Sequence, residues 1–238
     1  MAIELAISNW SGWTPSSSVS PVRIAETPDV SSIPTLLRRR LNMLGRACAT
    51  EIMRHIHDGD NLPIVFCSRH GDIERTFGIL TDLARNEPVS PMNFSLSVHN
   101  AIAGVISIHL GISANISSIA ALEEGLVPVL LEAVGLLDDE QNKVLCVLGD
   151  VPLPEIYRKD CLWPDTPFVV CFTVSTQDGL PLCLDMEHQQ FTPDSASSQQ
   201  PSLEPLKFVE FLASAQQSLT TPHNGGWWTI RKRGQTCS

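Results

Sequence analysis

One stretch decides how this chain folds, SPMNFSLSVHNAIAGVISIHLG, which runs from Ser90 to Gly111. Its first part alternates apolar and polar side chains from Phe94 to Val98, which is typical of a β-strand. Its second part, from Asn100 onward, is apolar on nearly every side, and a helix of that kind is buried. The stretch therefore predicts a strand that runs without a loop into a buried helix. Several enzyme classes place a nucleophile at such a junction, because a helix N-terminus lowers a thiol pKa and binds an oxyanion.

The rest of the chain predicts an alternation of strands and helices around this stretch. We expect strands near residues 3–6, 22–25, 63–68, 143–148, 168–175 and 227–231. We expect helices near residues 35–57, 72–85, 100–111, 116–137 and 206–219. Such an alternation is typical of a layered α/β fold, in which we expect the strand at 168–175 to run opposite to its neighbours.

The length of 238 residues fits one α/β domain with a short appendage. A polar segment rich in Ser, Gln and Pro occupies residues 195–205 and is expected to be a loop. We therefore predict a main domain at residues 1–194. Residues 195–238 are expected to form the polar loop, a C-terminal helix and a tail.

The composition excludes several classes of function. The net charge is −10, whereas binding to nucleic acid phosphates needs a basic surface. The longest uncharged stretch, Pro88 to Leu122, contains His99, Asn100 and several serines, so we expect it in a core or a subunit interface and not across a membrane. The seven scattered cysteines and the acidic start, Met1 to Glu4, predict a cytoplasmic protein with reduced thiols. Because there is no Cys-x-x-Cys pair and no phosphate-loop spacing, we expect no metal and no other cofactor.

The stretch from Phe94 to Gly111 resembles the nucleophile elbow of ketosynthases of the thiolase fold. In those proteins a strand runs into an Asp-Thr-Ala-Cys-Ser turn, and the central helix that follows ends in a sequence like Ile-His-Leu. The pattern Ser-Leu-Ser-Val-His-Asn-Ala at residues 95–101 more closely resembles the small ketosynthase-like N-terminal family that acts as chain length factor in bacterial aryl polyene clusters. Residues 34–41, 66–72 and 144–150 also fit that family. The resemblance covers about residues 24–175 and implies an incomplete thiolase-like α/β fold, roughly the N-terminal half of a ketosynthase.

The same resemblance implies a subunit without catalytic activity of its own. Alignment on Ile108-His109-Leu110 places Ala101 where the nucleophilic Cys belongs, and the half that carries the catalytic His-His or His-Asn pair is missing. We therefore expect a chain length factor that pairs with a full-length β-ketoacyl-ACP synthase in aryl polyene biosynthesis and helps to bound its acyl tunnel. The acyl carrier protein is acidic in such pathways, so we expect it to dock mainly on the partner synthase.

Two groups of residues follow from this expectation. In thiolase-fold dimers the strand before the elbow pairs antiparallel with its counterpart, which implies an interface formed by Phe94, Leu96, Ser97, Val98, His99 and Asn100. The helix after the strand that ends in a Ser/Gly turn carries the tunnel candidates Ile73, Thr76, Phe77 and Leu80. Their spacing of i, i+3, i+4 and i+7 puts them on one helix face. The alternative for that face is simple packing on the sheet, and the alternative for His99 and Asn100 is capping of the next helix.

Two other functions remain open at this point. One is an acyltransferase or hydrolase that uses Cys67 or a Ser/His pair, although a lone Cys on an apolar strand also suits a small buried hydrophobe. The other is a solitary acyl-binding protein. His70 with Asp72 suggests either a dyad or a helix cap, and Asp150 after Gly149 suggests either a site carboxylate or a structural turn.

Overall fold

The computed structural model describes residues 2–15, 22–121, 125–158, 165–187, 204–223 and 226–233. The strands within these ranges are β1 (Ala2–Thr14), β2 (Arg23–Ile24), β3 (Ile64–Cys67), β4 (Ile116–Ile119), β5 (Lys143–Asp150), β6 (Phe168–Ser175), β7 (Leu180–Glu187), β8 (Ser218–His223) and β9 (Gly226–Lys232). The helices are α1 (Thr35–Arg40), α2 (Met43–His55), α3 (Ile73–Ala84), α4 (Pro91–Ser97), α5 (Ala101–Leu110), α6 (Leu126–Leu136), α7 (Glu155–Arg158) and α8 (Glu204–Ala213).

All described strands belong to one mixed sheet. Its order is β4-β3-β5-β6-β1-β7-β9-β8, and β2 pairs with β1 outside this path. Strands β4, β3 and β5 are parallel to one another, and β6 runs antiparallel to β5, as the sequence predicted for this strand. Strand β1 connects the two parts of the sheet, because it pairs antiparallel with both β6 and β7. Strand β4 therefore lies at one end of the sheet, and its outer edge pairs with no strand in the described part of the chain.

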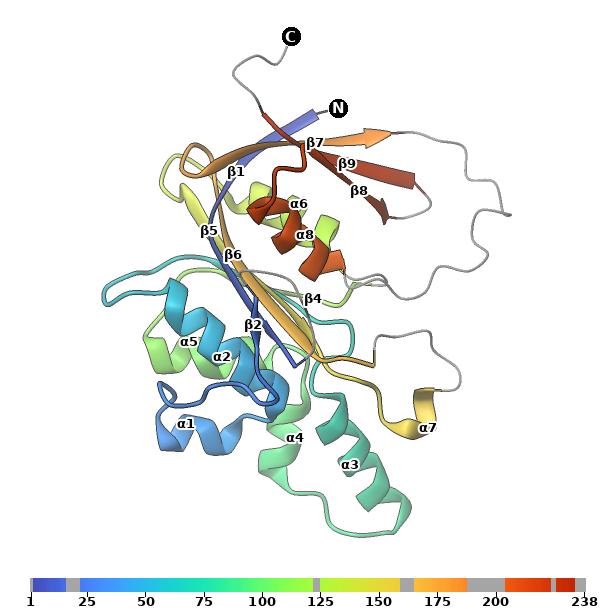
Figure 1. The fold of residues 1–238 in the computed structure, drawn as a ribbon. Coiled ribbons are helices and arrows are strands. Elements are labelled where there is room, and N and C mark those ends of the chain that lie inside the picture. The colour runs from blue at the N-terminus through green and yellow to red at the C-terminus, as the bar shows by residue number, and fades with distance from the viewer. Residues whose placement is uncertain are drawn as a thin grey trace.

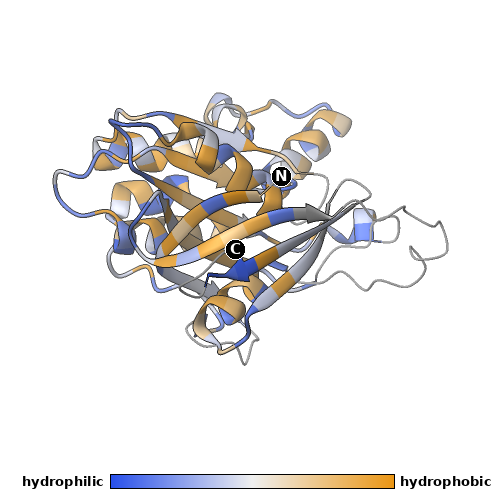
Figure 2. Ribbon diagram, turned by 90° about the horizontal axis from the view of Figure 1, so that it is seen from above, coloured by the Kyte–Doolittle hydropathy of each residue, from blue (hydrophilic) through white to orange (hydrophobic). Residues whose placement is uncertain are grey.

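Helices cover both faces of the sheet and give it three layers (Figure 1). Side chains alternate between the faces along each strand, so Ile64 and Phe66 of β3 pack with α1, α2 and α5. Val65 and Cys67 of the same strand point the other way, into a core that includes α6 and α8. The sequence of a strand that is buried on both faces is continuously apolar, and for this reason β3, β5 and β6 could be predicted. The hydropathy colouring of Figure 2 shows apolar residues along the central strands.

The strand predicted at Phe94 to Val98 is wrong, because these residues belong largely to helix α4. The Ser90 side chain accepts a hydrogen bond from the Asn93 amide, and Pro91 occupies the first turn. Both are strong helix-start signals, and they outweigh a short apolar alternation. Helix α5 is consequently preceded by another helix and not by a strand. It is also less buried than predicted, since Ile108 near its end is 81% exposed.

Three other predicted helices also differ from the structure. The helix predicted at 206–219 is α8, which ends at Ala213, and Ser218 and Leu219 belong to strand β8. Residues 116–137 form strand β4 and then helix α6, because β4 pairs in parallel with β3 and that long-range pairing is invisible to local periodicity. The predicted helix at 35–57 is two helices, and Asn42 caps the second by accepting a hydrogen bond from Gly45. Helix α3 and strands β5 and β6 confirm their predictions.

The C-terminal segment joins the same sheet and core as the rest of the chain. Phe208 and Phe211 of α8 are buried, and Phe208 meets Phe172 of β6 edge-on at 5.2 Å between ring centroids. Strand β9 pairs with β7, so the strand predicted at its position is confirmed. The polar loop at 195–205 and the domain boundary at residue 194 lie mostly outside the described residues and stay predictions. None of the described helices is long and apolar enough to cross a membrane.

Candidate functional site

Three parallel strands end at the same edge of the sheet, and each continues into a helix. Strand β3 is followed by α3, β4 by α6, and β5 by α7. In α/β sheets this carboxyl edge is where functional side chains gather, because the turns after the strands lie next to one another. Ser68, which follows β3, and Asp150, which ends β5, meet there.

Asp150 holds the turn that follows β3. Its Oδ1 accepts a hydrogen bond from the Ser68 hydroxyl at 2.7 Å, and the Arg69 amide donates to its Oδ2 at 3.0 Å. The His70 amide approaches Oδ1 at 3.5 Å. Burial raises the pKa of this carboxyl to about 6, and these donors oppose the rise. The arrangement is that of a structural turn, in which the carboxylate is occupied by the chain itself.

The two histidines near this turn have different surroundings. The ring Nε2 of His99 lies 2.6 Å from the Ser68 carbonyl oxygen, so the side chain is directed into the body of this chain. Gly71 has a φ of +58°, and a Cβ there would meet the His99 ring at 3.4 Å. Burial lowers the pKa of His70.

Asp72 caps helix α3, as one interpretation of the sequence predicted, because its Oδ1 accepts a hydrogen bond from the Arg75 amide at 3.0 Å.

Ala101 is the first residue of α5. The alignment that placed the nucleophile position there required a strand ahead of it, and helix α4 stands in its place. Asn100 is the N-cap residue of α5, but its side chain makes no cap hydrogen bond, so the predicted side-chain cap is wrong. Leu96 and Ala101 line a small cavity together with Arg40 and Arg75.

A strand-to-helix junction does occur at β4 and α6. The residues between these elements are Ala120, Ala121, Leu122, Glu123, Glu124 and Gly125, of which 122–124 lie outside the described part of the structure. None of the six has a thiol or hydroxyl side chain. Gly125 has a φ of +85°, and a Cβ there would clash with the Cys67 sulfur. Sequence reasoning missed this junction, although the glycine and the isoleucines before it were available signals.

Cys67 is a buried thiol. Burial raises its pKa to about 12, so the sulfur is protonated at neutral pH and is a poor nucleophile. Cys67 and His70 have the Cys-x-x-His spacing that occurs in metal sites, but a metal site needs further ligands close by. The described residues contain no group of three His, Cys, Asp or Glu side chains arranged to hold a metal ion.

The four tunnel candidates lie on a helix that projects from the sheet. Helix α3 packs against α4, and Ile79 is its only buried residue. Ile73, Thr76 and Phe77 are half-buried and Leu80 is 49% exposed; of the four, Ile73 packs against the core beneath α2 and α5. The Phe77 ring meets Tyr157 of α7 edge-on at a centroid distance of 6.0 Å.

The two predicted groups of residues meet on the α3–α4 hairpin. Figure 1 shows both helices at the lower end of the molecule, away from the sheet. Several large apolar side chains on this hairpin and just after it are exposed. We call them the α3–α4 apolar face: Leu80, Leu83, Met92, Phe94 and Val98, with exposed fractions of 49%, 55%, 63%, 62% and 47%. Of the remaining predicted interface residues, Leu96, Ser97 and His99 are half-buried and Asn100 is exposed.

A Ser/His pair exists elsewhere, between β1 and α2. The Ser11 hydroxyl lies 2.9 Å from Nε2 of His55 and donates a hydrogen bond of 2.7 Å to Glu51. In a catalytic triad the acid orients the histidine, whereas here Glu51 bonds the serine and an ion pair of 2.6 Å joins it to Arg23. The buried Nδ1 of His55 has no hydrogen-bond partner among the described residues, so no acid holds the ring from the side opposite Ser11. This group ties β1 to α2 and does not support a hydrolase.

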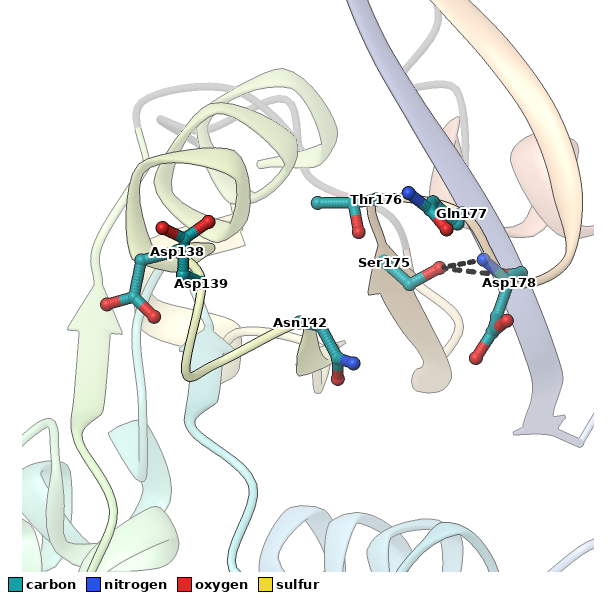
Figure 3. A pocket seen from close by; sticks show the side chains of 7 residues that line it. All are labelled: Asp138, Asp139, Asn142, Ser175, Thr176, Gln177 and Asp178. Atoms are coloured by element: carbon teal, nitrogen blue, oxygen red, sulfur yellow. Dashed lines mark hydrogen bonds between the residues drawn. The ribbon is translucent and has the colours of Figure 1, made fainter.

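A polar pocket lies at the opposite end of the parallel strands. Figure 3 shows it between the turn that follows α6 and the turn that joins β6 to β7. The Ser175 hydroxyl donates a hydrogen bond to the Asp178 carbonyl and accepts one from its amide. Lys143 neutralises Asp178 with an ion pair of 2.9 Å. The pocket walls are therefore turns closed by their own contacts.

Comparison with known proteins identifies the family. A family model for the β-ketoacyl synthase N-terminal domain matches residues 10–229. The chain belongs to this family. The resemblance to ketosynthase-like proteins, first seen in residues 94–111, is thereby confirmed, and it extends over most of the chain. Among curated proteins, no sequence matches this ketosynthase-like chain.

Solved structures show the same fold. The ketosynthase-like chain covers 97% of its length and all of one chain in the complex of the ketosynthase ApeO with its chain length factor ApeC from Xenorhabdus doucetiae, at 25% identity and a TM-score of 0.79. It covers 93% of its length and 88% of a chain of the ishigamide ketosynthase/chain length factor, at 13% identity and a TM-score of 0.60. It covers 74% of its length and 56% of a β-ketoacyl synthase from Burkholderia phymatum, at 10% identity and a TM-score of 0.53. The predicted incomplete thiolase-like α/β fold is confirmed.

Proposed function

We propose that this chain is a non-catalytic chain length factor, which pairs with a full-length β-ketoacyl-ACP synthase in aryl polyene biosynthesis. The observation that carries the proposal is the match over the whole of one chain in a ketosynthase–chain length factor complex, at a TM-score of 0.79. A complete match of this kind differs from the match to the Burkholderia phymatum synthase, of which only 56% is covered. The chain therefore corresponds in length to the matched chain of that complex and not to a full-length synthase.

The α3–α4 apolar face supports pairing with a large partner. Five exposed apolar side chains on adjacent elements form the kind of surface that soluble proteins cover by association. The free edge of β4 is a second contact region, since Ile116–Ile119 carries no charge and no proline to block pairing. The family resemblance implies that a strand of this chain pairs antiparallel with a strand of the synthase. We assign this pairing to β4, because residues 94–98 do not form a strand. Phe94 of α4 and Val98 just after it then contribute as exposed side chains.

The lack of a nucleophile supports the non-catalytic role. Neither Ala101 nor any residue between β4 and α6 has a thiol or hydroxyl side chain, so no acyl thioester forms at either position. Burial raises the pKa of the thiols of Cys67, Cys146 and Cys171, which keeps them protonated. Cys67 is thus a small buried hydrophobe, and the acyltransferase alternative loses its nucleophile.

The half-buried face of α3 supports a role in bounding the acyl tunnel. Ile73, Thr76, Phe77 and Leu80 share one side of the helix, and all but Ile73 lie outside the hydrophobic core clusters. The Phe77 ring meets Tyr157 of α7 edge-on, and a bulky ring at this position is suited to stop a growing chain. The carrier protein, which is acidic in such pathways, docks mainly on the synthase, because a subunit of net charge −10 repels it. Reduced thiols in a cytoplasmic location fit this pathway.

Co-expression tests the proposal. The chain is produced with a full-length β-ketoacyl synthase from the same source, and the mixture is separated by size-exclusion chromatography. We expect a 1:1 complex that condenses malonyl units on a carrier protein, whereas this chain alone remains unacylated in intact-mass measurements. Elution of the two proteins as separate monomers, or acylation of the isolated chain, contradicts the proposal.

A further inference from the structure

The α3–α4 hairpin is attached to the rest of the molecule with little hydrophobic burial. Ile79 is the only buried residue of α3, and α4 has none. Helices usually keep their place because an apolar stripe packs on a core. The position of this hairpin therefore depends on other contacts, and the structure provides a set of polar ones.

Arg75 joins three helices through its guanidinium group. Its Nε donates to the Asp72 carboxylate at 2.8 Å, at the start of α3. Its Nη1 donates to the Asn93 side chain of α4 at 3.1 Å, and its Nη2 donates to the Arg40 carbonyl at the end of α1 at 3.0 Å. The donors of a guanidinium point in fixed directions within one plane, so the three bonds together define one arrangement of the helices. The side chain is only 17% exposed, and its bonds to Asp72 and Asn93 are partly buried, whereas the bond to Arg40 lies at the surface.

The start of α3 is also tied to the end of the sheet. The Gly71 amide donates to the Ser68 hydroxyl at 2.9 Å, and that hydroxyl donates to Asp150 of β5 at 2.7 Å. Ser68, Asp72 and Asp150 are all buried. A chain of polar contacts thus runs from β5 through the turn after β3 to Asp72, and from Arg75 to α4 and α1.

We propose that Arg75 is a positioning residue, which sets the angle and spacing of α3 and α4 and so presents the α3–α4 apolar face in the shape its partner needs. A surface held in its bound arrangement before association avoids the entropy cost of ordering on binding. What the face binds rests on the proposed function. The positioning itself is a property of this chain alone, so it is testable without the synthase.

Hydrogen exchange of the isolated full chain gives the first test. In Arg75→Gln we expect amides of α3 and α4 to exchange at least about 10-fold faster, because charged hydrogen bonds are lost, while β3 and β5 remain protected as in the wild type. Arg85→Gln is the matched control, since Arg85 is an exposed arginine at the end of α3 and should leave exchange unchanged. Asn93→Ala removes only the bond to α4 and should accelerate α4 more than α3. It carries the test if Arg75→Gln does not fold.

Binding to the co-expressed synthase gives the second test. Arg75→Gln should weaken binding about 10-fold, and Arg75→Lys should not restore it, because an ammonium keeps the charge but lacks the planar donors. Full rescue by lysine overturns the proposal, as does wild-type exchange in both Arg75→Gln and Asn93→Ala. If the wild-type chain fails to bind any synthase while the exchange result holds, the proposed function fails and the positioning role of Arg75 stands.

Discussion

Truncation of Phe94 measures how much the α3–α4 apolar face contributes to pairing. The side chain is 62% exposed in this chain. A phenylalanine has ~200 Å² of surface, so ~120 Å² remains for a partner to cover. At ~25 cal/mol per Å², covering this area contributes ~3 kcal/mol to association. Phe94→Ala should therefore weaken the complex with the synthase ~100-fold.

Isothermal titration of the purified chain with the synthase measures this effect. Because Phe94 contributes little to the core of this chain, its truncation should change the denaturation midpoint of the isolated chain only slightly. Leu36→Ala is the matched control, since Leu36 is a large apolar residue of α1 with an exposed fraction of 77% and lies off the face. A dissociation constant within about twofold of wild type for Phe94→Ala, or an equal loss for Leu36→Ala, refutes the assignment of the interface to this face.

Three other predictions follow from particular residues. Phe77→Ala should leave the heterodimer intact and shift the products toward longer chains, because the ring no longer limits the tunnel; an unchanged product profile, measured by mass spectrometry, assigns the limit to the partner. Gly125→Ala should lower the free energy of unfolding by roughly 2–4 kcal/mol, since the φ of +85° and the Cys67 sulfur both oppose a Cβ. Gly78→Ala, with nothing within 4 Å of the added Cβ, should stabilise slightly in the same denaturant titration, and equal effects of the two changes would contradict this. Burial raises the pKa of Asp150 from 3.8 to about 6, so folding favours the protonated carboxyl group. This stabilisation of the fold is complete below pH 3.8 and is lost as the pH rises through about 6. The free energy of unfolding of the wild type relative to Asp150→Asn should thus fall by roughly 3 kcal/mol across that window, and a constant difference refutes the assignment.

The strands buried on both faces were predictable, and so was the antiparallel direction of β6. Strands β3, β5 and β6 are continuous apolar runs, and helix α3 has both an amphipathic pattern and its Asp72 cap. Helix α4 was not predicted, because five alternating residues favour a strand when Ser90 and Pro91 are not weighed as a helix start. Strand β4 was not predicted either, since its four residues become a strand only by pairing with β3.

Three of the five residues of the α3–α4 apolar face were named from the sequence, but their arrangement was not predicted. Phe94, Val98 and Leu80 were named from two separate expectations, and the structure brings them onto one hairpin and its end. Leu83 and Met92 of the same face were missed, because the sequence does not reveal which apolar residues of a short helix remain uncovered. The bonds from Arg75 to α1 and α4 were also missed, since they join residues 35 and 18 positions apart.

The sequence by itself determined the layered α/β class, the likeness to ketosynthases and the absence of a thiol or hydroxyl group at Ala101. These depend on local patterns and on which side chains are present, and folding does not alter either. Only the tertiary structure decided which strand precedes α6, which strand edge is free and which apolar side chains stay exposed. Each of these depends on contacts between distant segments, such as β3 with β4 or Arg75 with Arg40, whose energy is gained only when the whole chain has folded.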